Sequence, residues 1–293
     1  MERHRLAAPV SFTLALGIIV AAILGPLLTN WIRFRLPDSL VTQYEGGEVV
    51  TLVLAAPLLI AAGWLWLRGD QLAPALAFGP AVYTVYTFVT AIVGQEYARY
   101  DGNGERAFPL YAALIALGSA VAMISLSQLL QQPAPMPPDR LRVAVAGIFL
   151  LIAAFFAFAW TGQIVQVYGG EKTTEYLEGP TLFWLIKILD LGFLLPALAA
   201  IGVGLLRRSD LAVRFAYGMV TYAVCMAGAV LGMGIAMWLE DDPAASVAMI
   251  AFLAPVTAGL GVLAARMLMH YRPRDDRRDR RVVAKTFGAG HAG

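Results

Sequence analysis

Two charged side chains within one apolar stretch are the groups in this sequence best suited to do chemistry. Asp190 lies inside the apolar run 180–206, and Lys187 lies three residues before it. Counting from Pro180 at about 1.5 Å per residue places Asp190 about 15 Å into a hydrocarbon layer about 30 Å thick. A carboxylate at that depth is costly unless it is protonated, paired or hydrated, so it suggests a path for an ion or a solute.

The role of this pair is open at the level of sequence. Because Lys187 is one helical turn from Asp190 on the same face, the two charges can neutralise each other in a structural ion pair. They can equally form a binding or proton-relay pair. In a third interpretation, Lys187 extends toward the headgroups and leaves Asp190 alone.

Five further polar residues complete the predicted substrate-binding set, beside Asp190 and Lys187. Tyr83, Tyr86 and Thr87 can share one face of a helix that leads to Glu96. Glu48 occupies the position of Lys187 in the internal repeat described below, so opposite charges can meet across the repeat. The alternatives are structural, because hydroxyl groups also bond helices together and a glutamate can cap a helix among the headgroups.

Several kinds of enzyme are excluded by what the sequence lacks. It contains no Walker motif, no Gly-x-Ser-x-Gly elbow and no His-Glu-x-x-His motif. The histidines His4, His270 and His291 fall at or beyond the ends of apolar runs, and Cys225 is the single cysteine, so histidine and cysteine offer no ligand set for a metal within the membrane. We therefore expect no enzyme activity, no metal, no cofactor and no nucleic-acid partner.

Composition predicts an all-α integral membrane protein. The chain is 59% hydrophobic and 14% charged, with a mean hydropathy of +0.68, far from the averages of soluble domains. Apolar runs long enough to cross a bilayer as helices occur eight times. These predicted spans are 8–29, 48–67, 73–95, 108–130, 142–164, 180–206, 211–238 and 244–270.

An internal repeat indicates that the eight spans form two tandem four-helix units. Residues 52–89 align without gaps on residues 191–228, at a shift of 139, with 13 identities in 38 positions. The identities include Pro57 with Pro196, Gly63 with Gly202, Arg68 with Arg207, Gly79 with Gly218 and Tyr83 with Tyr222. We predict a first unit at 1–130, a proline-rich linker at 131–141, a second unit at 142–270 and a disordered Arg/Asp tail at 271–293.

The repeat also predicts local features of the helices. Pro57 and Pro196 each remove one helical hydrogen bond, so we expect matched kinks. Small residues at Gly228, Gly232 and Ala236 form a close-packing face, which we expect to pack on the last span. The basic start followed by residues 8–29 resembles a cleaved signal, but these residues fill the place of 142–164 in the second unit, so we expect them to be retained.

Charge predicts that both termini are cytoplasmic. With eight spans, 16 of the 22 Lys and Arg residues fall on the side of the termini, five on the other side and Lys187 within a span. The outer side also carries 12 acids, a net charge of 5 − 12 = −7. Tryptophans fall near both predicted membrane surfaces: Trp31, Trp160, Trp184 and Trp238 outside, Trp64 and Trp66 inside. Nineteen arginines against three lysines indicate a GC-rich bacterial coding sequence, so we expect the bacterial plasma (inner) membrane.

These patterns favour a protein that binds and moves a small solute or cation through its polar intramembrane residues. Its expected partners are the lipid bilayer, that solute, and other subunits in a homo- or hetero-oligomer. The alternative is a non-catalytic scaffold or accessory subunit whose polar residues only hold helices together. A third possibility, an enzyme acting on lipid at the outer leaflet, requires a nucleophile beside the outer carboxylates, and the sequence offers no recognisable set.

Overall fold

Helices make up the whole secondary structure that the computed structural model describes, which covers residues 2–243 and 245–271. Eight helices in this part of the chain are long and apolar enough to cross a membrane, so the predicted number of spans is confirmed. These spans are Leu6–Leu24, Asp38–Leu67, Ala73–Val93, Gly104–Gln131, Asp139–Tyr168, Pro180–Leu206, Asp210–Leu239 and Val247–Tyr271. The chain is a multi-pass membrane protein.

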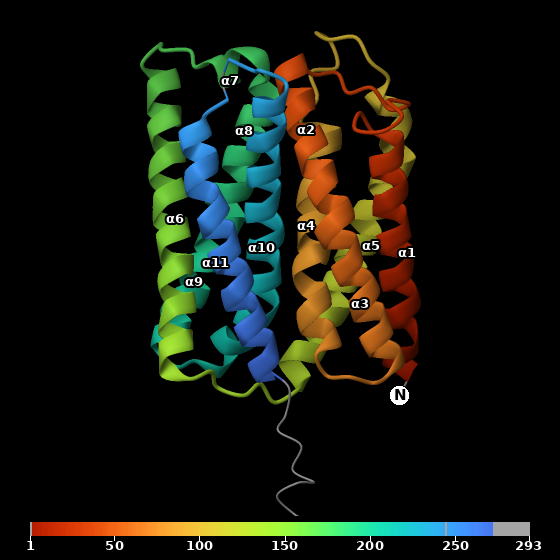
Figure 1. Cartoon of the computed structure of the whole chain (residues 1–293), viewed down its shortest axis with the longest axis vertical. Coiled ribbons are helices and arrows are strands. Elements are labelled where there is room, and N and C mark those ends of the chain that lie inside the picture. The colour runs from red at the N-terminus through yellow and green to blue at the C-terminus, as the bar shows by residue number, and fades with distance from the viewer. Residues whose placement is uncertain (1, 244, 272–293) are drawn as a thin grey trace, which may run out of the picture.

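The spans lie side by side in two halves, with the helices running along the long axis of the molecule (Figure 1). The first half comprises α1 (Glu2–Leu24), α2 (Asp38–Val50), η1 (Thr51–Ala55), α3 (Ala56–Leu67), α4 (Ala73–Val93), η2 (Gly104–Ala107) and α5 (Phe108–Gln131). The second half comprises α6 (Asp139–Tyr168), α7 (Thr174–Glu178), α8 (Pro180–Leu189), η3 (Asp190–Leu194), α9 (Leu195–Leu206), α10 (Asp210–Leu239) and α11 (Val247–Tyr271).

Helix α1 begins and α11 ends at the same end of the bundle, which we call the termini end; the opposite end is the loop end (Figure 1). Within the first half, α1 packs on α3 and α4 packs on α5. Within the second half, α6 packs on α9 and α10 packs on α11. The halves meet where α10 lies against α2 and α4, and we call this contact the seam.

The second span begins ten residues earlier than the sequence predicted. Pro37 is the N-cap of α2, and Asp38 supplies an acid to the first turn, where the helix dipole favours negative charge. The polar residues that follow Asp38 lower the local hydropathy, which is why the sequence prediction began the span at Glu48. Glu48 therefore lies well inside a helix rather than at its start.

Two π-helical segments interrupt the second and sixth spans just before their prolines. Segments η1 and η3 begin 139 residues apart, at Thr51 and Asp190, the same shift as in the sequence alignment. The residue before each proline donates to a carbonyl five positions earlier, Ala56 to Thr51 and Leu195 to Asp190. One wide turn thus accommodates each predicted break in the hydrogen-bond ladder.

Glycines bring the helices of the two halves into backbone contact along the seam. A Cβ atom at Gly46 would lie 2.3 Å from the carbonyl oxygen of Gly232, and a Cβ atom at Gly79 would lie 2.1 Å from the backbone nitrogen of Tyr222. The small face of α10 was predicted to pack on the last span. It packs on α2 instead, and Gly261 of α11 has open space beside it. The seam is therefore a close-packed contact that admits no added methyl group at these points.

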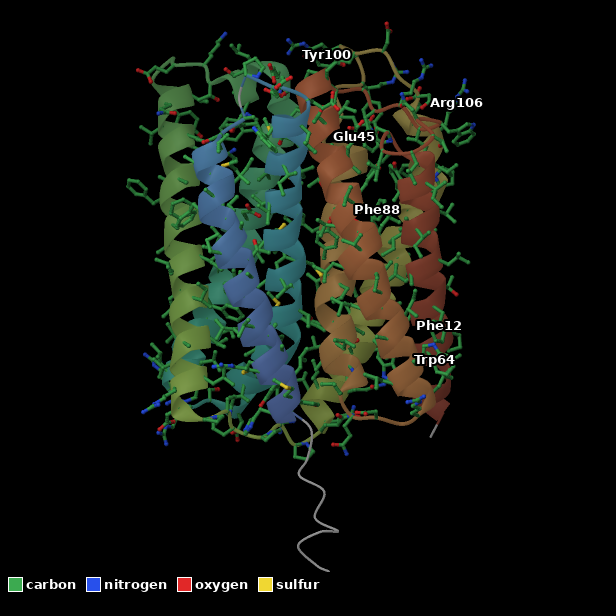
Figure 2. All side chains as sticks on the ribbon, viewed as in Figure 1. Phe12, Glu45, Trp64, Phe88, Tyr100 and Arg106 are labelled. Carbon is green, nitrogen blue, oxygen red and sulfur yellow. The ribbon has the colours of Figure 1, made fainter. Side chains whose placement is uncertain are left out.

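Only some tryptophans form the predicted aromatic belts. Trp64 lies at the termini end near Phe12 and is 56% exposed (Figure 2). Trp66 is only 3% exposed, and its indole N–H donates to Gln128 Oε1 at 2.9 Å. Trp66 lies at the predicted end of the helix but does not face lipid. It is two residues from Trp64, so their side chains point about 200° apart around the helix, one toward lipid and the other toward the core.

The linker between the halves lies against the second half. Its Pro135 carbonyl accepts a hydrogen bond from Tyr217 at 2.7 Å, and Gln132 Oε1 accepts one from Tyr271 at 3.1 Å. Tyr271 is buried and ends α11, so the tail cannot begin there as predicted. The rest of the predicted tail, 272–293, lies outside the described residues.

Candidate functional site

The carboxylate of Asp190 is buried where η3 of the second half faces α4 and α6. The side chain is 7% exposed. Its Oδ1 accepts a hydrogen bond from the Tyr86 hydroxyl at 3.0 Å, and its Oδ2 accepts one from the Trp160 indole N–H at 2.8 Å. Tyr86 belongs to the first half and Trp160 to the second, so the carboxylate is held by neutral donors from both halves.

Lys187 is equally buried but does not pair with Asp190. Its side chain is 4% exposed, and its ammonium lies over two aromatic rings, 3.8 Å from the Phe183 centroid and 4.2 Å from that of Trp160. The charged groups of Lys187 and Asp190 are not within ion-pair distance. The structural ion pair considered from the sequence is therefore not formed. The ammonium lies over Phe183, one turn nearer the start of α8, and its charge interacts with Glu175 as well as with Asp190, so the side chain runs in the direction of the predicted extension toward the headgroups.

Phe183, Lys187 and Asp190 lie on one side of the sixth span, together with Trp160 and Tyr86 from neighbouring helices. We call these five residues the Asp190 cluster. Sequence reasoning missed the role of Trp160, because the predicted end of its span at residue 164 put this residue near the membrane surface. Helix α6 continues to Tyr168, so Trp160 is about 12 Å from its end and can reach a buried partner.

Two buried polar atoms near the cluster have no hydrogen-bond partner in the described part of the chain. One is the hydroxyl of Tyr222, a residue that is 2% exposed and interacts electrostatically with Asp190. The other is Oε1 of Gln163, which lies one helical turn beyond Trp160 on α6. Buried polar atoms without a hydrogen-bond partner are uncommon in folded proteins, so a water molecule or a ligand is expected to bond them.

Glu48 belongs to a separate place in the first half. Its Oε2 accepts a hydrogen bond from the backbone N–H of Leu27 at 3.1 Å, and its carboxylate fills the space beside Gly25. The predicted meeting of Glu48 with Lys187 across the repeat is not formed, nor does Glu48 cap a helix, since α2 begins at Asp38. Glu48 instead holds the turn that follows α1.

The predicted polar stripe on α4 divides between the two halves. Tyr83 faces the first half, where its hydroxyl lies 3.2 Å from Thr51 Oγ1 and donates to the Gly47 carbonyl at 3.4 Å. Tyr86, three residues on, donates instead to Asp190. Thr87 is half-buried, and its backbone carbonyl accepts the Thr90 hydroxyl at 2.8 Å. The hydroxyls of Tyr83 and Tyr86 therefore bond to different halves.

Glu96 lies at the loop end, against the start of the helix that carries Phe183 and Lys187. Its Oε1 accepts the backbone N–H of Thr181, near the start of α8, at 2.6 Å. A carboxylate at a helix start is stabilised by the helix dipole. The structure thus gives Glu96 a role in joining the α4–α5 loop to α8.

The loops of the first half form a cross-linked cover at the loop end. Arg35 donates to both carboxylate oxygens of Glu105, at 2.8 and 2.9 Å, and to the Tyr100 carbonyl at 3.0 Å. The hydrogen bonds to Glu105 raise the pKa of the Arg35 guanidinium above its ordinary value. Tyr100, Arg106 and Glu45 all lie toward this end (Figure 2).

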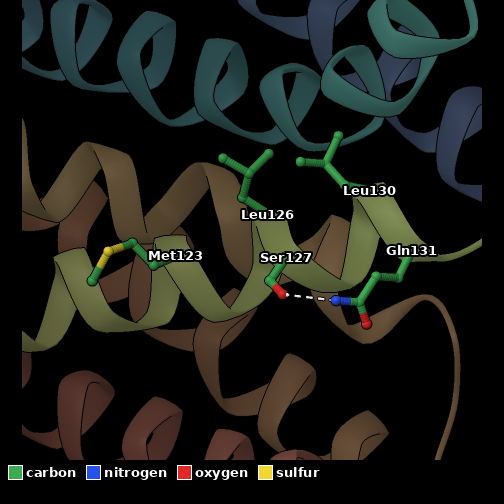
Figure 3. Close-up of a pocket in the computed structure, with 5 residues that line it drawn as sticks. All are labelled: Met123, Leu126, Ser127, Leu130 and Gln131. Carbon is green, nitrogen blue, oxygen red and sulfur yellow. Dashed lines mark hydrogen bonds between the residues drawn. The ribbon is translucent and has the colours of Figure 1, made fainter.

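Neither a metal centre nor the described surface pocket coincides with the cluster. Among the described residues, no three His, Cys, Asp or Glu side chains gather in a way that could hold a metal ion. A pocket lies on one face of α5, near its end at the linker (Figure 3). It is lined by Met123, Leu126, Ser127, Leu130 and Gln131. Its polar groups bond each other, Gln131 to Ser127 at 3.3 Å, so it offers little to a charged ligand.

Comparison with known proteins gives no relative, so the geometry is the only guide to function. No protein-family model, curated protein or solved structure matches this chain. What the Asp190 cluster offers chemically is a carboxylate with unused acceptor positions, an ammonium that donates to none of the described residues, and two aromatic faces.

Proposed function

We propose that this chain binds a small solute or cation at the Asp190 cluster and moves it across the bacterial plasma membrane. In this proposal the protein is built as two tandem four-helix repeats with both termini cytoplasmic, so the loop end faces outward. It needs no metal or cofactor and is not an enzyme. The acidic outer surface concentrates cations near the route to the cluster.

One observation carries the proposal: Asp190 is buried beside a lysine and yet is not paired with it. A carboxylate kept only for stability is expected to pair with the nearest cation, because each buried charge left alone is strongly destabilising. Asp190 instead accepts two neutral donors, which leaves about two of its four acceptor positions free. Intramembrane acids of this kind typically mark ion or solute paths.

The position of Asp190 also supports a transport role. It begins η3, and π-helical turns occur often at functional sites. Its donors come from both halves, so a relative movement of the halves would change the coordination of the carboxylate. Binding sites at the contact between two helical repeats are common in secondary transporters.

The test is uptake by proteoliposomes of three radiolabelled probes: sodium, choline and glycine. We expect at least one to accumulate through the wild-type chain, and the Asp190→Asn variant to reduce that uptake roughly tenfold or more, as removal of a charge that binds the solute should. An Asp101→Asn variant is the control, because Asp101 is exposed at the loop end. Equal uptake by both variants would remove Asp190 from the mechanism.

A scaffold function is the second candidate, and the seam favours it. Helices in backbone contact at Gly46 and Gly232 hold the halves closely, which suits a rigid support. In that case Asp190→Asn would lower the thermal stability, and no probe would be taken up by the wild-type chain.

A further inference from the structure

The ligand class follows from the groups that the Asp190 cluster leaves unsatisfied. Lys187 is the first of them. An ammonium has three N–H donors, and this one has two ring faces beneath it but donates no hydrogen bond to any residue that the structure describes. Ring faces attract a cation but do not accept its hydrogen bonds in full. Lys187 therefore has N–H donors available to a ligand.

Asp190 has free acceptor positions and no charged donor bonded to it. Its two hydrogen bonds come from an indole and a phenol, both neutral, and neither neutralises the negative charge. The remaining acceptor positions suit a cationic donor. The cluster thus holds one positive and one negative charge on buried side chains, and neither forms a close ion pair with a described residue. Lys187 interacts with Glu175 and Asp190 only over a longer distance.

The balance of charge selects between ligands. A simple cation would satisfy Asp190 but leave three charges in an apolar region with a net charge of +1. A simple anion would satisfy Lys187 and leave a net charge of −1. A zwitterion satisfies both groups and adds no net charge, so the cluster stays neutral in a low-dielectric surrounding.

The orphaned atoms near the cluster supply a second, independent indication of a ligand. The Tyr222 hydroxyl is buried, has no described partner and interacts electrostatically with Asp190. Oε1 of Gln163 is an unpaired acceptor one turn from Trp160. The Tyr222 hydroxyl can accept from the ammonium of an amino-acid-like ligand or donate to its carboxylate, and the Gln163 amide oxygen can accept from the ammonium.

We infer that the solute of the proposed function is a small zwitterion, whose ammonium binds Asp190 and whose carboxylate binds Lys187. This inference rests on the proposed function and adds the substrate class. Three residues of helix correspond to a rise of about 4.5 Å, so the ligand is short, of the size of an α- or β-amino acid.

The test is isothermal titration of the full chain in lipid nanodiscs with four probes. Glycine and β-alanine are zwitterions, ethylamine carries only the ammonium and propionate carries only the carboxylate. We expect a zwitterion to bind roughly tenfold or more tightly than either single-charge probe. Ethylamine binding as tightly as both zwitterions would overturn the inference.

Two variants make the assignment of each charge falsifiable. Lys187→Met should weaken glycine binding roughly tenfold or more and strengthen ethylamine binding, because the competing positive charge is gone. Asp190→Asn should weaken glycine binding and strengthen propionate binding. Lys187→Arg is the control that keeps the charge and should keep the preference for the zwitterion, and thermal unfolding of each variant checks that it is folded. A merely structural pair of residues would change all four affinities in the same direction.

Failure of this inference can be told apart from failure of the proposed function. If the zwitterions do not bind, but sodium or choline is taken up in a manner that depends on Asp190, the ligand class is wrong and the transport site remains. If no probe binds the wild-type chain and none is taken up, both are overturned.

Discussion

The carboxylate of Asp190 receives one hydrogen bond from each half of the molecule, from Tyr86 on α4 and from Trp160 on α6. The ring of Trp160 also makes a cation–π contact with the Lys187 ammonium. A single side chain thus contacts the negative group through its N–H and the positive group through its π system. This double contact explains how two opposite charges can lie one turn apart without pairing.

Replacing Trp160 with Phe separates these two contacts. The Trp160→Phe variant keeps a ring near Lys187 but removes the hydrogen bond to Oδ2 of Asp190, so we expect a loss of about 1–3 kcal/mol in the free energy of unfolding. Trp184→Phe is the matched control, because Trp184 packs on Phe183 and Tyr176 through its ring. Thermal and denaturant unfolding in detergent measure both variants. Equal stabilities for the two would show that the indole hydrogen bond is unimportant.

The two tyrosines near Asp190 should respond differently to removal of their hydroxyls. Tyr86→Phe takes a donor from a buried carboxylate and should destabilise the protein by about 1–3 kcal/mol. Tyr222→Phe removes a buried hydroxyl that has no described partner, so the stability of the ligand-free protein should stay constant or rise. Unfolding measurements on both variants check this. A large loss of stability in Tyr222→Phe would mean that its hydroxyl is bonded after all.

The sequence identified the central residues of the site and one of their partners, Tyr86, but not Trp160 or Phe183. Depth in an apolar run was sufficient to select Asp190 and Lys187, because charge in a membrane is costly wherever it occurs. The direction of a side chain is a different matter. Tyr83 and Tyr86 are one turn apart, yet they bond different halves, since contacts between distant helices depend on rotation about each helix axis. Trp160 was misjudged because the end of α6 was placed four residues too early.

The elements around the site illustrate the same limit. The prolines at 57 and 196 predicted disturbed helices, but the sequence did not indicate the form of the disturbance. A π-helical turn places one extra residue in the helix, which rotates the residues before it relative to those after it. Asp190 and Thr51 lie at the start of these turns. Thr51 bonds Tyr83 within the first half, while Asp190 reaches across to Tyr86.

The crossing of α2 and α10 provides a test at the scale of helices. Gly46→Ala would put a methyl group 2.3 Å from the Gly232 carbonyl oxygen, so the helices must separate, and we expect a loss of about 1–3 kcal/mol in the free energy of unfolding. Gly47→Ala is the matched control on the next residue, because its added Cβ would meet only Met233 Cε at 3.5 Å. That contact is ordinary, and alanine favours the helix by about 0.5–1 kcal/mol over glycine. Thermal unfolding of both variants decides whether the seam is as close as the structure shows; similar values would contradict it.

At the scale of the whole molecule, the seam holds the two halves together, whereas transport through the Asp190 cluster requires some movement between them. Close glycine contacts at Gly46 and Gly79 oppose any separation of the halves. The hydrogen bond from Tyr86 to Asp190 is a weaker link that a ligand ammonium can replace. We therefore expect movement during transport to be confined to the side of the seam where α4 meets α8, with the α2–α10 contact kept closed.

The direction in which the bundle crosses the membrane decides which end admits the solute. Sixteen Lys and Arg residues on the side of the termini against five on the other predict that the termini end is cytoplasmic. The single cysteine, Cys225, is buried, so the chain is suited to cysteine labelling. In intact cells, a membrane-impermeant maleimide should label an Asp101→Cys variant at the loop end. It should label an Arg140→Cys variant, at the exposed start of α6, only after the cells are made permeable.

Labelling in the reverse order would overturn more than the orientation. The five basic and twelve acidic residues of the loop end would then face the cytoplasm, where their net charge of −7 could not concentrate external cations. Asp190 lies about 15 Å from the start of α8 at the loop end, and this shorter approach would then open to the cytoplasm. The Asp190 cluster would keep its chemistry in that case, but the solute would reach it first from inside the cell, and the proposed function would become export.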